Sequence, residues 1–342
     1  MNIITENKVV RSICWFTESA RSPRLIYALN DIETRLIERG YTIQTKRICF
    51  NTEPISALAN LEETEGLYLS VGSLDYKTAN EQLYDFLQAK NVSFNLDLTT
   101  SVDLEDVEVL FRIINKAPEK TFNFTYTFQN RPSSPFFPSA TFEKPGFAIG
   151  LQSTDLSEGC ADMEEWLSNM RSVWEEVCSI FVDRADFLGI DASIAPLFRG
   201  KSSLVHFVKR ISGGFSRVVT TDLFVKLTQF LSTHNPKPVG LCGLMLPCLE
   251  DFELAEEYEA GQFSIERNIF LSLHSGLGID SYPIGINESP KRVLEVLRLL
   301  QMLSVKYEKP LSARFVSDGK ARIGDRTDFR NQYLKDVRIR PL

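Results

Sequence analysis

The sequence predicts an α/β fold of roughly ten strands, because short strand-like and longer helix-like stretches alternate from end to end. The short runs are rich in β-branched and aromatic residues, and the longer ones have apolar residues at helical period. This alternation is typical of parallel strands joined by helical crossovers. Roughly ten strands are too many for a typical open sheet, so we expect a closed or two-part arrangement.

The first part of the chain is expected to contain five strands and three helices. The first strand is expected at 11–17 and the first helix at 22–40, with Ser22 as N-cap, Pro23 at its first position and Gly40 as its stop. Further strands are expected at 41–50, 66–72, 92–98 and 121–128. The helices between them are expected at 76–90 and 101–117.

A proline- and serine-rich stretch at 129–146 interrupts the alternation and predicts an irregular connection. We expect one domain over 1–342, with parts at about 1–135 and 147–342 on either side of this connection. Strands of the second part are expected at 147–152, 187–193, 239–247, 279–285 and 311–316. Its helices are expected at 163–185, 203–211, 221–234, 264–278 and 289–307, with an acidic helix after residue 247.

The composition favours a globular protein of the cytoplasm. The net charge is -7, with both signs mixed along the chain, which argues against a nucleic-acid-binding surface. No run approaches the ~18 apolar residues of a membrane span, so we expect no membrane partner. The six cysteines include no C-x-x-C pair and are expected to be free thiols in a reducing compartment.

The carboxyl ends of parallel strands are where ligands collect in α/β folds, and this rule selects candidate residues. Asp191 and Ser193 end the strand expected at 187–193, and Pro196 prevents that strand from continuing. Asp191 is therefore a candidate catalytic base or metal ligand, and Ser193 a candidate substrate contact. The alternative is a turn or helix cap for Asp191 and a structural hydroxyl for Ser193, which stands in no G-x-S-x-G motif.

Glu250 and Asp251 follow the strand expected at 239–247 within one helical turn and are candidate catalytic residues. Alternatively, they only complement the dipole of the acidic helix, a gain of roughly 0.3–1 kcal/mol each. The later glutamates, from Glu253 to Glu259, are expected on a solvated face of that helix.

Three further side chains are candidate substrate contacts. Gln44 and Arg47 lie on an unusually polar strand and would face a cavity that holds an anionic substrate, unless that strand is a solvated edge. Asp280 follows a glycine-containing turn, which could also place it in a loop at the opposite end of the fold.

Metal and nucleotide motifs are weak in this sequence. The three histidines have no metal-ligand spacing, so any metal would be a hard ion such as Mg²⁺ or Ca²⁺ held by oxygen ligands. The glycine-containing stretches match neither G-x-G-x-x-G nor the P-loop. We expect a small-molecule ligand and a homodimer, which is the commonest oligomer of soluble proteins.

Six stretches spread along the chain are considered together: "RGYTIQTKRICFN", "SPFFPSATFEKPGFAIGLQ", "FLGIDASIAP", "GLCGLMLPCLEDFELAEEYEAGQFS", "SGLGIDSYPIG" and "GKARIGDRTDF". They resemble the family catalogued as domain of unknown function 711, or uncharacterised protein family 0210. The resemblance implies a ten-stranded α/β barrel made of two half-barrels, like that of pyruvate formate-lyase and other glycyl radical enzymes. It places the candidates named above, with Asp325, inside matching motifs.

The resemblance does not imply radical chemistry, because "KARIGDR" around Gly324 lacks the glycyl radical signature. We expect an enzyme that acts on a small polar or anionic metabolite by carboxylate acid/base or metal-assisted lyase or hydrolase chemistry. The alternative is a non-catalytic metabolite-binding or regulatory protein on an enzyme-like barrel.

Overall fold

The structure is a computed structural model that describes residues 7–20, 25–51 and 53–342. The predicted start of the first helix at Ser22 and Pro23 lies outside these residues. The helix itself is α2 (Leu25–Ile37), and Gly40 closes the following turn with a φ of +82°. Among the described residues, no helix is both long and apolar enough to cross a membrane.

The described residues form the expected α/β fold, with ten strands in one sheet. Along the sheet the order is β8-β7-β1-β3-β4-β5-β6-β10-β9, and the short β2 pairs with β1. The strands are β1 (Val9–Phe16), β2 (Thr42–Ile43), β3 (Lys46–Cys49), β4 (Leu67–Leu74), β5 (Val92–Asp97), β6 (Phe124–Phe128), β7 (Gly146–Leu151), β8 (Phe187–Asp191), β9 (Gly278–Pro283) and β10 (Leu311–Val316).

The strands fall into two sets that run in opposite directions. The first set, β1 to β6, is parallel throughout, and the neighbours β7 and β8, like β9 and β10, are also parallel. The joins between this first set and the second set, β7 to β10, are antiparallel, at β1–β7 and at β6–β10. The alternation of strands and helices alone had suggested a uniformly parallel sheet. The observed sheet is mixed, with two antiparallel joins.

The two end strands, β8 and β9, are linked by the closing segment, residues 238–247. This segment forms isolated parallel bridges to the β8 side at Ile194 and to the β9 side at Gly276, both through Leu244. Further parallel bridges pair Ile190 with Pro238 and Pro247 with Asp280. Single bridges thus complete a ring of backbone around the interior, where the sequence predicted a regular strand.

Two positive φ angles explain why the closing segment is not a regular strand. Gly240 has a φ of +66° and Cys242 a φ of +45°, so the backbone leaves the extended region twice within three residues. The strand predicted at 41–50 is likewise divided, into β2 and β3.

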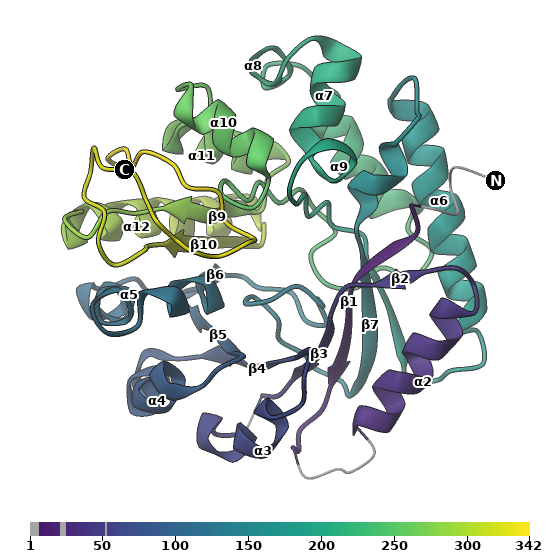
Figure 1. Cartoon of the computed structure of the whole chain (residues 1–342), viewed down its shortest axis with the longest axis horizontal. Helices are drawn as coiled ribbons and strands as arrows, with labels where there is room; N and C mark the ends of the chain where they lie inside the picture. The colour runs from purple at the N-terminus through teal and green to yellow at the C-terminus, as the bar shows by residue number, and fades with distance from the viewer. Residues whose placement is uncertain (1–6, 21–24, 52) are drawn as a thin grey trace.

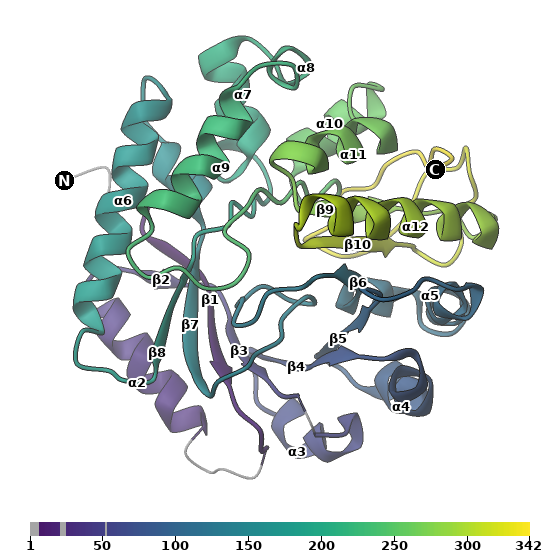
Figure 2. The same ribbon diagram turned by 180° about the vertical axis from the view of Figure 1, so that it is seen from behind.

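Helices surround the strands on the outside (Figures 1 and 2). Their apolar faces pack onto the sheet, with Trp166 and Trp174 of α6 fully buried. The remaining helices are α3 (Ala59–Glu62), α4 (Tyr76–Gln88), α5 (Leu104–Lys116), α6 (Met163–Ile180), α7 (Leu204–Ser212), α8 (Phe215–Val218), α9 (Leu223–His234), α10 (Phe252–Glu259), α11 (Ile265–His274) and α12 (Pro290–Tyr307). Short 3₁₀ turns are η1 (Ile55–Leu58), η2 (Pro118–Asn123), η3 (Ser153–Ser157) and η4 (Gly200–Ser202).

The irregular connection between β6 and β7 enters the ring of strands. The side chain of Asn95 on β5 donates hydrogen bonds to the carbonyls of Pro138 and Ala140, at 3.2 and 3.1 Å. Gly150 on β7 leaves room for Phe136, since a Cβ there would lie 2.7 Å from that ring. This connection fills part of the interior and leaves space at the opening where the second set of strands ends, which we call the mouth.

Candidate functional site

Two adjoining cavities occupy the interior at the mouth. The larger has a volume of about 920 Å³ and the inner one about 60 Å³. Both are lined by Arg11, Arg47, Phe137, Pro138, Glu250 and Arg314. Because the two sets of strands are antiparallel, the mouth combines the carboxyl ends of the second set with the amino ends of the first.

A buried ion cluster forms one wall of these cavities. Arg314 on β10 pairs with Glu250 and with Asp280, whose Oδ1 lies 2.7 Å from its Nε. The other oxygen of Glu250 lies 3.6 Å from a guanidinium nitrogen of Arg11. The Arg314 side chain is only 8% exposed, and burial opposes its charge, but the two carboxylates outweigh burial and raise its pKa.

Arg47 faces the same cavities and has different partners in the described part of the chain. Its Nε donates to the Thr45 hydroxyl at 3.0 Å, one Nη to the Pro135 carbonyl at 3.3 Å, and its guanidinium lies 5.0 Å from the Phe137 ring centroid. Burial, and secondly the charge of Arg11, lower the pKa of Arg47 to about 10. None of these partners neutralises the guanidinium charge.

Positive charge therefore exceeds negative charge around the cavities. The basic lining residues of the two cavities are Arg11, Arg47, Lys90, Arg314 and Arg330, and the acidic ones are Glu119, Glu250 and Asp280. The Nε of Arg11 is buried and has no hydrogen-bond partner among the described residues. A small anion in this space would offer acceptors to both Arg11 and Arg47.

Aromatic side chains form much of the remaining wall. They are Tyr68, Phe122, Phe137, Phe198, Phe329 and Tyr333. Tyr333 belongs to a C-terminal stretch, 329–333, that borders the larger cavity, and its ring stacks on Phe198 with centroids 5.7 Å apart. The cavity can thus accommodate an anion that carries an apolar or planar body.

Four of the residues predicted from the sequence come together here. Arg47, Glu250 and Asp280 line the cavities as described above. Gln44 lines the larger cavity, and its side-chain oxygen accepts a hydrogen bond from Arg11 at 3.2 Å. Asp280 lies within β9, not in a loop at the far end.

Asp191 and Ser193 lie outside the residues that line these cavities and hold the closing segment. The Asp191 carboxylate accepts hydrogen bonds from the backbone N–H groups of Leu241 and Cys242, both at 3.0 Å, and from the Ser193 hydroxyl at 2.6 Å. Ser193 Oγ in turn accepts from the N–H of Gly243 at 3.1 Å. These hydrogen bonds give both side chains a structural role, which is to hold the turn at residues 241–243.

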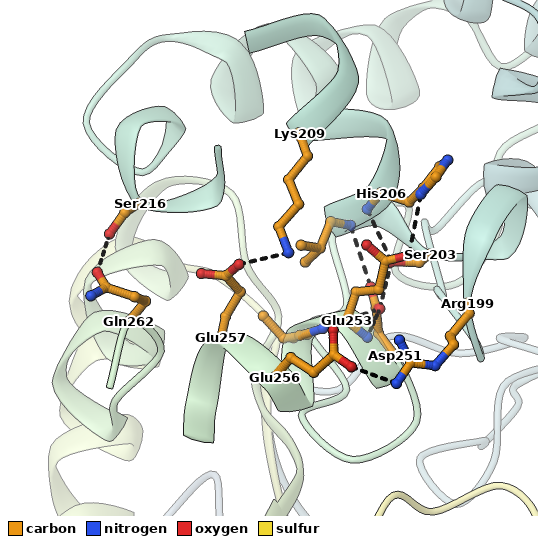
Figure 3. A network of polar contacts seen from close by, with 12 residues as sticks. Arg199, Ser203, His206, Lys209, Ser216, Asp251, Glu253, Glu256, Glu257 and Gln262 are labelled. Atoms are coloured by element: carbon orange, nitrogen blue, oxygen red, sulfur yellow. Dashed lines mark hydrogen bonds and ion pairs between the residues drawn. The ribbon is translucent and has the colours of Figure 1, made fainter. Parts of the chain in front are cut away.

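Asp251 also lies outside the cavity lining and joins the starts of two helices (Figure 3). Its carboxylate accepts from the N–H groups of Glu253 and Leu254 on α10 and, across the interface, from the Leu204 N–H and the Ser203 hydroxyl of α7. Burial raises its pKa to about 6, against the effect of these donors. We place Asp251 and Asp191 in supporting roles.

The later glutamates of α10 are engaged in ion pairs, although a solvated face was expected. Figure 3 shows several of these pairs between α10 and the α7 region. Glu253 pairs with His206, Glu256 with Arg199 and Lys335, Glu257 with Lys209, and Glu259 with Arg326. The acidity that follows the closing segment is thus mostly matched by basic side chains of neighbouring segments.

The Glu256 pairs make a testable contribution to acid stability. The hydrogen bond from Arg199, followed by that from Lys335, lowers the pKa of Glu256 to about 2, below its ordinary 4.5. A lowered folded-state pKa stabilises the fold above pH 4.5, and this gain disappears as the pH falls towards 2. We expect Glu256→Gln to lower the free energy of unfolding at pH 7 by less than about 1 kcal/mol, because the side chain is partly exposed.

Urea unfolding at pH 7 and at pH 2.5 would measure this difference, with Glu81→Gln on the exposed face of α4 as the matched control. The difference in free energy of unfolding between wild type and Glu256→Gln should be smaller at pH 2.5 than at pH 7. An equal difference at both pH values would contradict an ionic contribution.

Sequence reasoning missed Arg11 and Arg314, two central members of the cluster. Each is a charged residue within a predicted strand, at 11–17 and 311–316, and that mismatch was the available signal. A charge inside a buried strand must be paired, so it points to an interior polar site.

Ligands for a metal ion are not assembled in the described residues. Across 7–20, 25–51 and 53–342, no group of three or more His, Cys, Asp and Glu side chains is arranged to hold one. These residues therefore provide no ligand set for the expected Mg²⁺ or Ca²⁺.

Comparison with known proteins gives a family but no activity. The model of the family described as Uncharacterised ACR (DUF711) matches residues 99–331. No curated protein matches the chain. Among solved structures, one titled "Anaerobic ribonucleotide reductase" is similar with a TM-score of 0.35 and 9% identity, covering 97% of this chain and 75% of that one. This likeness is too distant to support a statement about activity.

Proposed function

The chain belongs to the Uncharacterised ACR (DUF711) family, and from the residues that meet in its barrel we propose that it is an enzyme acting on a small anionic metabolite. In this proposal Arg47 and Arg11 bind the anionic group, and Glu250 transfers a proton. The reaction would be of the lyase or hydrolase class, carried out by acid/base chemistry without a glycyl radical. The observation that supports it most is the excess of guanidinium groups over carboxylates around the two adjoining cavities.

Anion binding is favoured because it compensates a cost that the folded protein already bears. A buried guanidinium without a carboxylate loses hydration and gains little in return. A substrate carboxylate or phosphate would accept bidentate hydrogen bonds from Arg47 and could also satisfy the unpartnered Nε of Arg11. The aromatic walls would contact the apolar part of the substrate.

Glu250 is the carboxylate best placed for proton transfer. It lines both cavities and is only 6% exposed, so it would act where water is largely excluded. Negative charge that develops on the substrate after proton removal would lie near Arg11 and Arg47, and guanidinium groups fixed in advance stabilise such charge. Asp280 and Arg314 would position Glu250.

A second candidate function is binding without catalysis. Both oxygens of Glu250 already contact guanidinium groups, of Arg314 and of Arg11, and these positive charges favour a carboxylate that stays ionised. A protein that only senses a metabolite would need the arginines and not a free carboxylate.

One experiment separates the two functions. A thermal-shift screen against anionic metabolites would first find ligands, and product analysis would then detect turnover. For an enzyme, we expect Glu250→Gln to keep ligand binding within about tenfold and to lower kcat by a factor of about 10²–10⁴. For a binding protein, no ligand would be converted even by the wild type.

Glu119→Gln is the matched control, because Glu119 lines the outer part of the same cavity. Turnover should be nearly unchanged in that variant. Equal kcat in wild type and Glu250→Gln would rule out Glu250 as the proton-transferring group, and a screen without any anionic hit would contradict the proposal as a whole.

A further inference from the structure

A third pocket, of about 420 Å³, lies at the end of the barrel opposite the mouth. It is bordered by α9, by residues 241–243 of the closing segment, by the end of α11, and by Lys309 and Pro310 just before β10. Figure 2 shows α9 and α12 on the near side of the barrel. We call it the basal pocket.

The charged side chains of the basal pocket are all basic. Among the described residues that line it, Arg131, His274 and Lys309 carry or can carry positive charge, and none is Asp or Glu. They come from three separate segments: the connection after β6, the end of α11, and the turn before β10. The lining of the pocket therefore offers basic side chains from three segments and no carboxylate.

Lys309 is the most informative of these residues because it is largely buried. Its Nζ donates to the Ser272 carbonyl at 2.8 Å, which leaves two ammonium protons to donate elsewhere. Burial lowers the pKa of Lys309 to about 8. Burial, and secondly the charge of Lys309, also lower the pKa of His274, whose Nδ1 lies 2.7 Å from Ser275 Oγ.

We propose that the basal pocket binds a phosphate group, either free or as part of a small phosphate ester. A tetrahedral oxyanion has acceptors in several directions, which suits donors that arrive from three segments. Val225, Leu241, Leu277 and Pro310 line the rest of the pocket and would contact the organic part of an ester. This phosphate site does not depend on whether the central cavities are catalytic.

Thiol chemistry does not explain this pocket, although Cys242 lines it. Burial, and then the neighbouring Asp191, raise the pKa of the Cys242 thiol to about 12, so it stays protonated. Its thiol contacts the Val239 carbonyl at 3.3 Å. We therefore assign binding, not nucleophilic attack, to this end of the barrel.

The basal pocket and the inner cavity share two side chains, Leu241 and Leu277. An occupant of the basal pocket would press on the same leucines that bound the inner cavity. Phosphate bound there would thus lie against a wall of the inner cavity without touching Arg47 or Glu250.

Calorimetric titration of the full chain with inorganic phosphate and with glycerol 3-phosphate tests the proposal. Because the central arginines can also attract phosphate, the titrations use the Arg47→Met protein as background. In that background we expect saturable binding, weakened at least tenfold by adding Lys309→Met and unchanged by adding Lys306→Met, an exposed lysine on α12. Adding His274→Gln should also weaken binding and gives a second, independent variant.

Tighter binding of glycerol 3-phosphate would identify an ester as the ligand, and equal or tighter binding of inorganic phosphate would identify the free ion. The proposal is overturned if the Arg47→Met protein shows no saturable phosphate binding. It is also overturned if Lys309→Met and Lys306→Met weaken binding equally, since that would indicate a general effect of surface charge.

Discussion

Replacing Arg47 by methionine is expected to weaken binding of anionic ligands by about 30-fold or more, because a charged hydrogen bond to a ligand contributes about 2–5 kcal/mol. The same change should leave the free energy of unfolding unchanged or raise it by up to about 1 kcal/mol. The reason is that Arg47 is a half-buried cation whose described partners are a hydroxyl, a carbonyl and an aromatic ring. Ligand affinity should thus fall while the free energy of unfolding stays the same or rises.

Ligand titration and urea unfolding of the same variant would check both halves of this prediction. Arg330→Met is the matched control, because Arg330 lines the exposed part of the same cavity, and it should change affinity only a few-fold. A strongly destabilised Arg47→Met protein would mean that Arg47 is structural, and unchanged affinity would remove it from the binding site.

Replacing Arg314 by methionine should have the largest effect on stability, a loss of about 3–5 kcal/mol in the free energy of unfolding. This change leaves Glu250 and Asp280 buried close to one another without their shared cation. Removing one partner of a buried ion pair costs much more than removing both, because the remaining charge loses its nearest counter-ion and is not rehydrated. Here Asp280 loses Arg314, and Glu250 keeps only the more distant Arg11.

Chemical denaturation of the single variant and of the double variant Arg314→Met/Glu250→Gln would measure this effect. The double variant should recover part of the loss, since one orphaned charge is neutralised. Arg326→Met, which breaks a surface pair with Glu259, should cost less than about 1 kcal/mol. If the Arg314 and Arg326 variants lose equal stability, the cluster is not the electrostatic centre described above.

Strand and helix positions could be predicted well because they depend on local pattern. The strand predicted at 311–316 has the same bounds as β10, and the strands predicted at 147–152 and 187–193 correspond to β7 and β8 within two residues. The relative direction of the two sets could not be predicted from the pattern, because both have the same periodicity. The relative direction of the two sets depends on which strands pair where the sets join, and the paired residues are far apart in the sequence.

The candidate site was only partly predictable for the same reason. The carboxyl-end rule selected Glu250 correctly as a residue near the mouth, but it applies only to the second set of strands. In the first set the mouth lies at the amino ends, so Arg11 and Arg47 required a different signal, a charge within a strand. Nor can a sequence show whether a carboxylate after a strand faces a cavity or turns back to backbone N–H groups, as Asp191 does.

The closing segment has a consequence for how the barrel can move. A continuous ladder resists sliding, because every residue of one strand is registered against its neighbour. Residues 238–247 instead touch their neighbours at separate points and are tied by the Asp191 carboxylate. They form a seam, at which the circumference of the barrel can widen or narrow while the strands β1 to β10 keep their register.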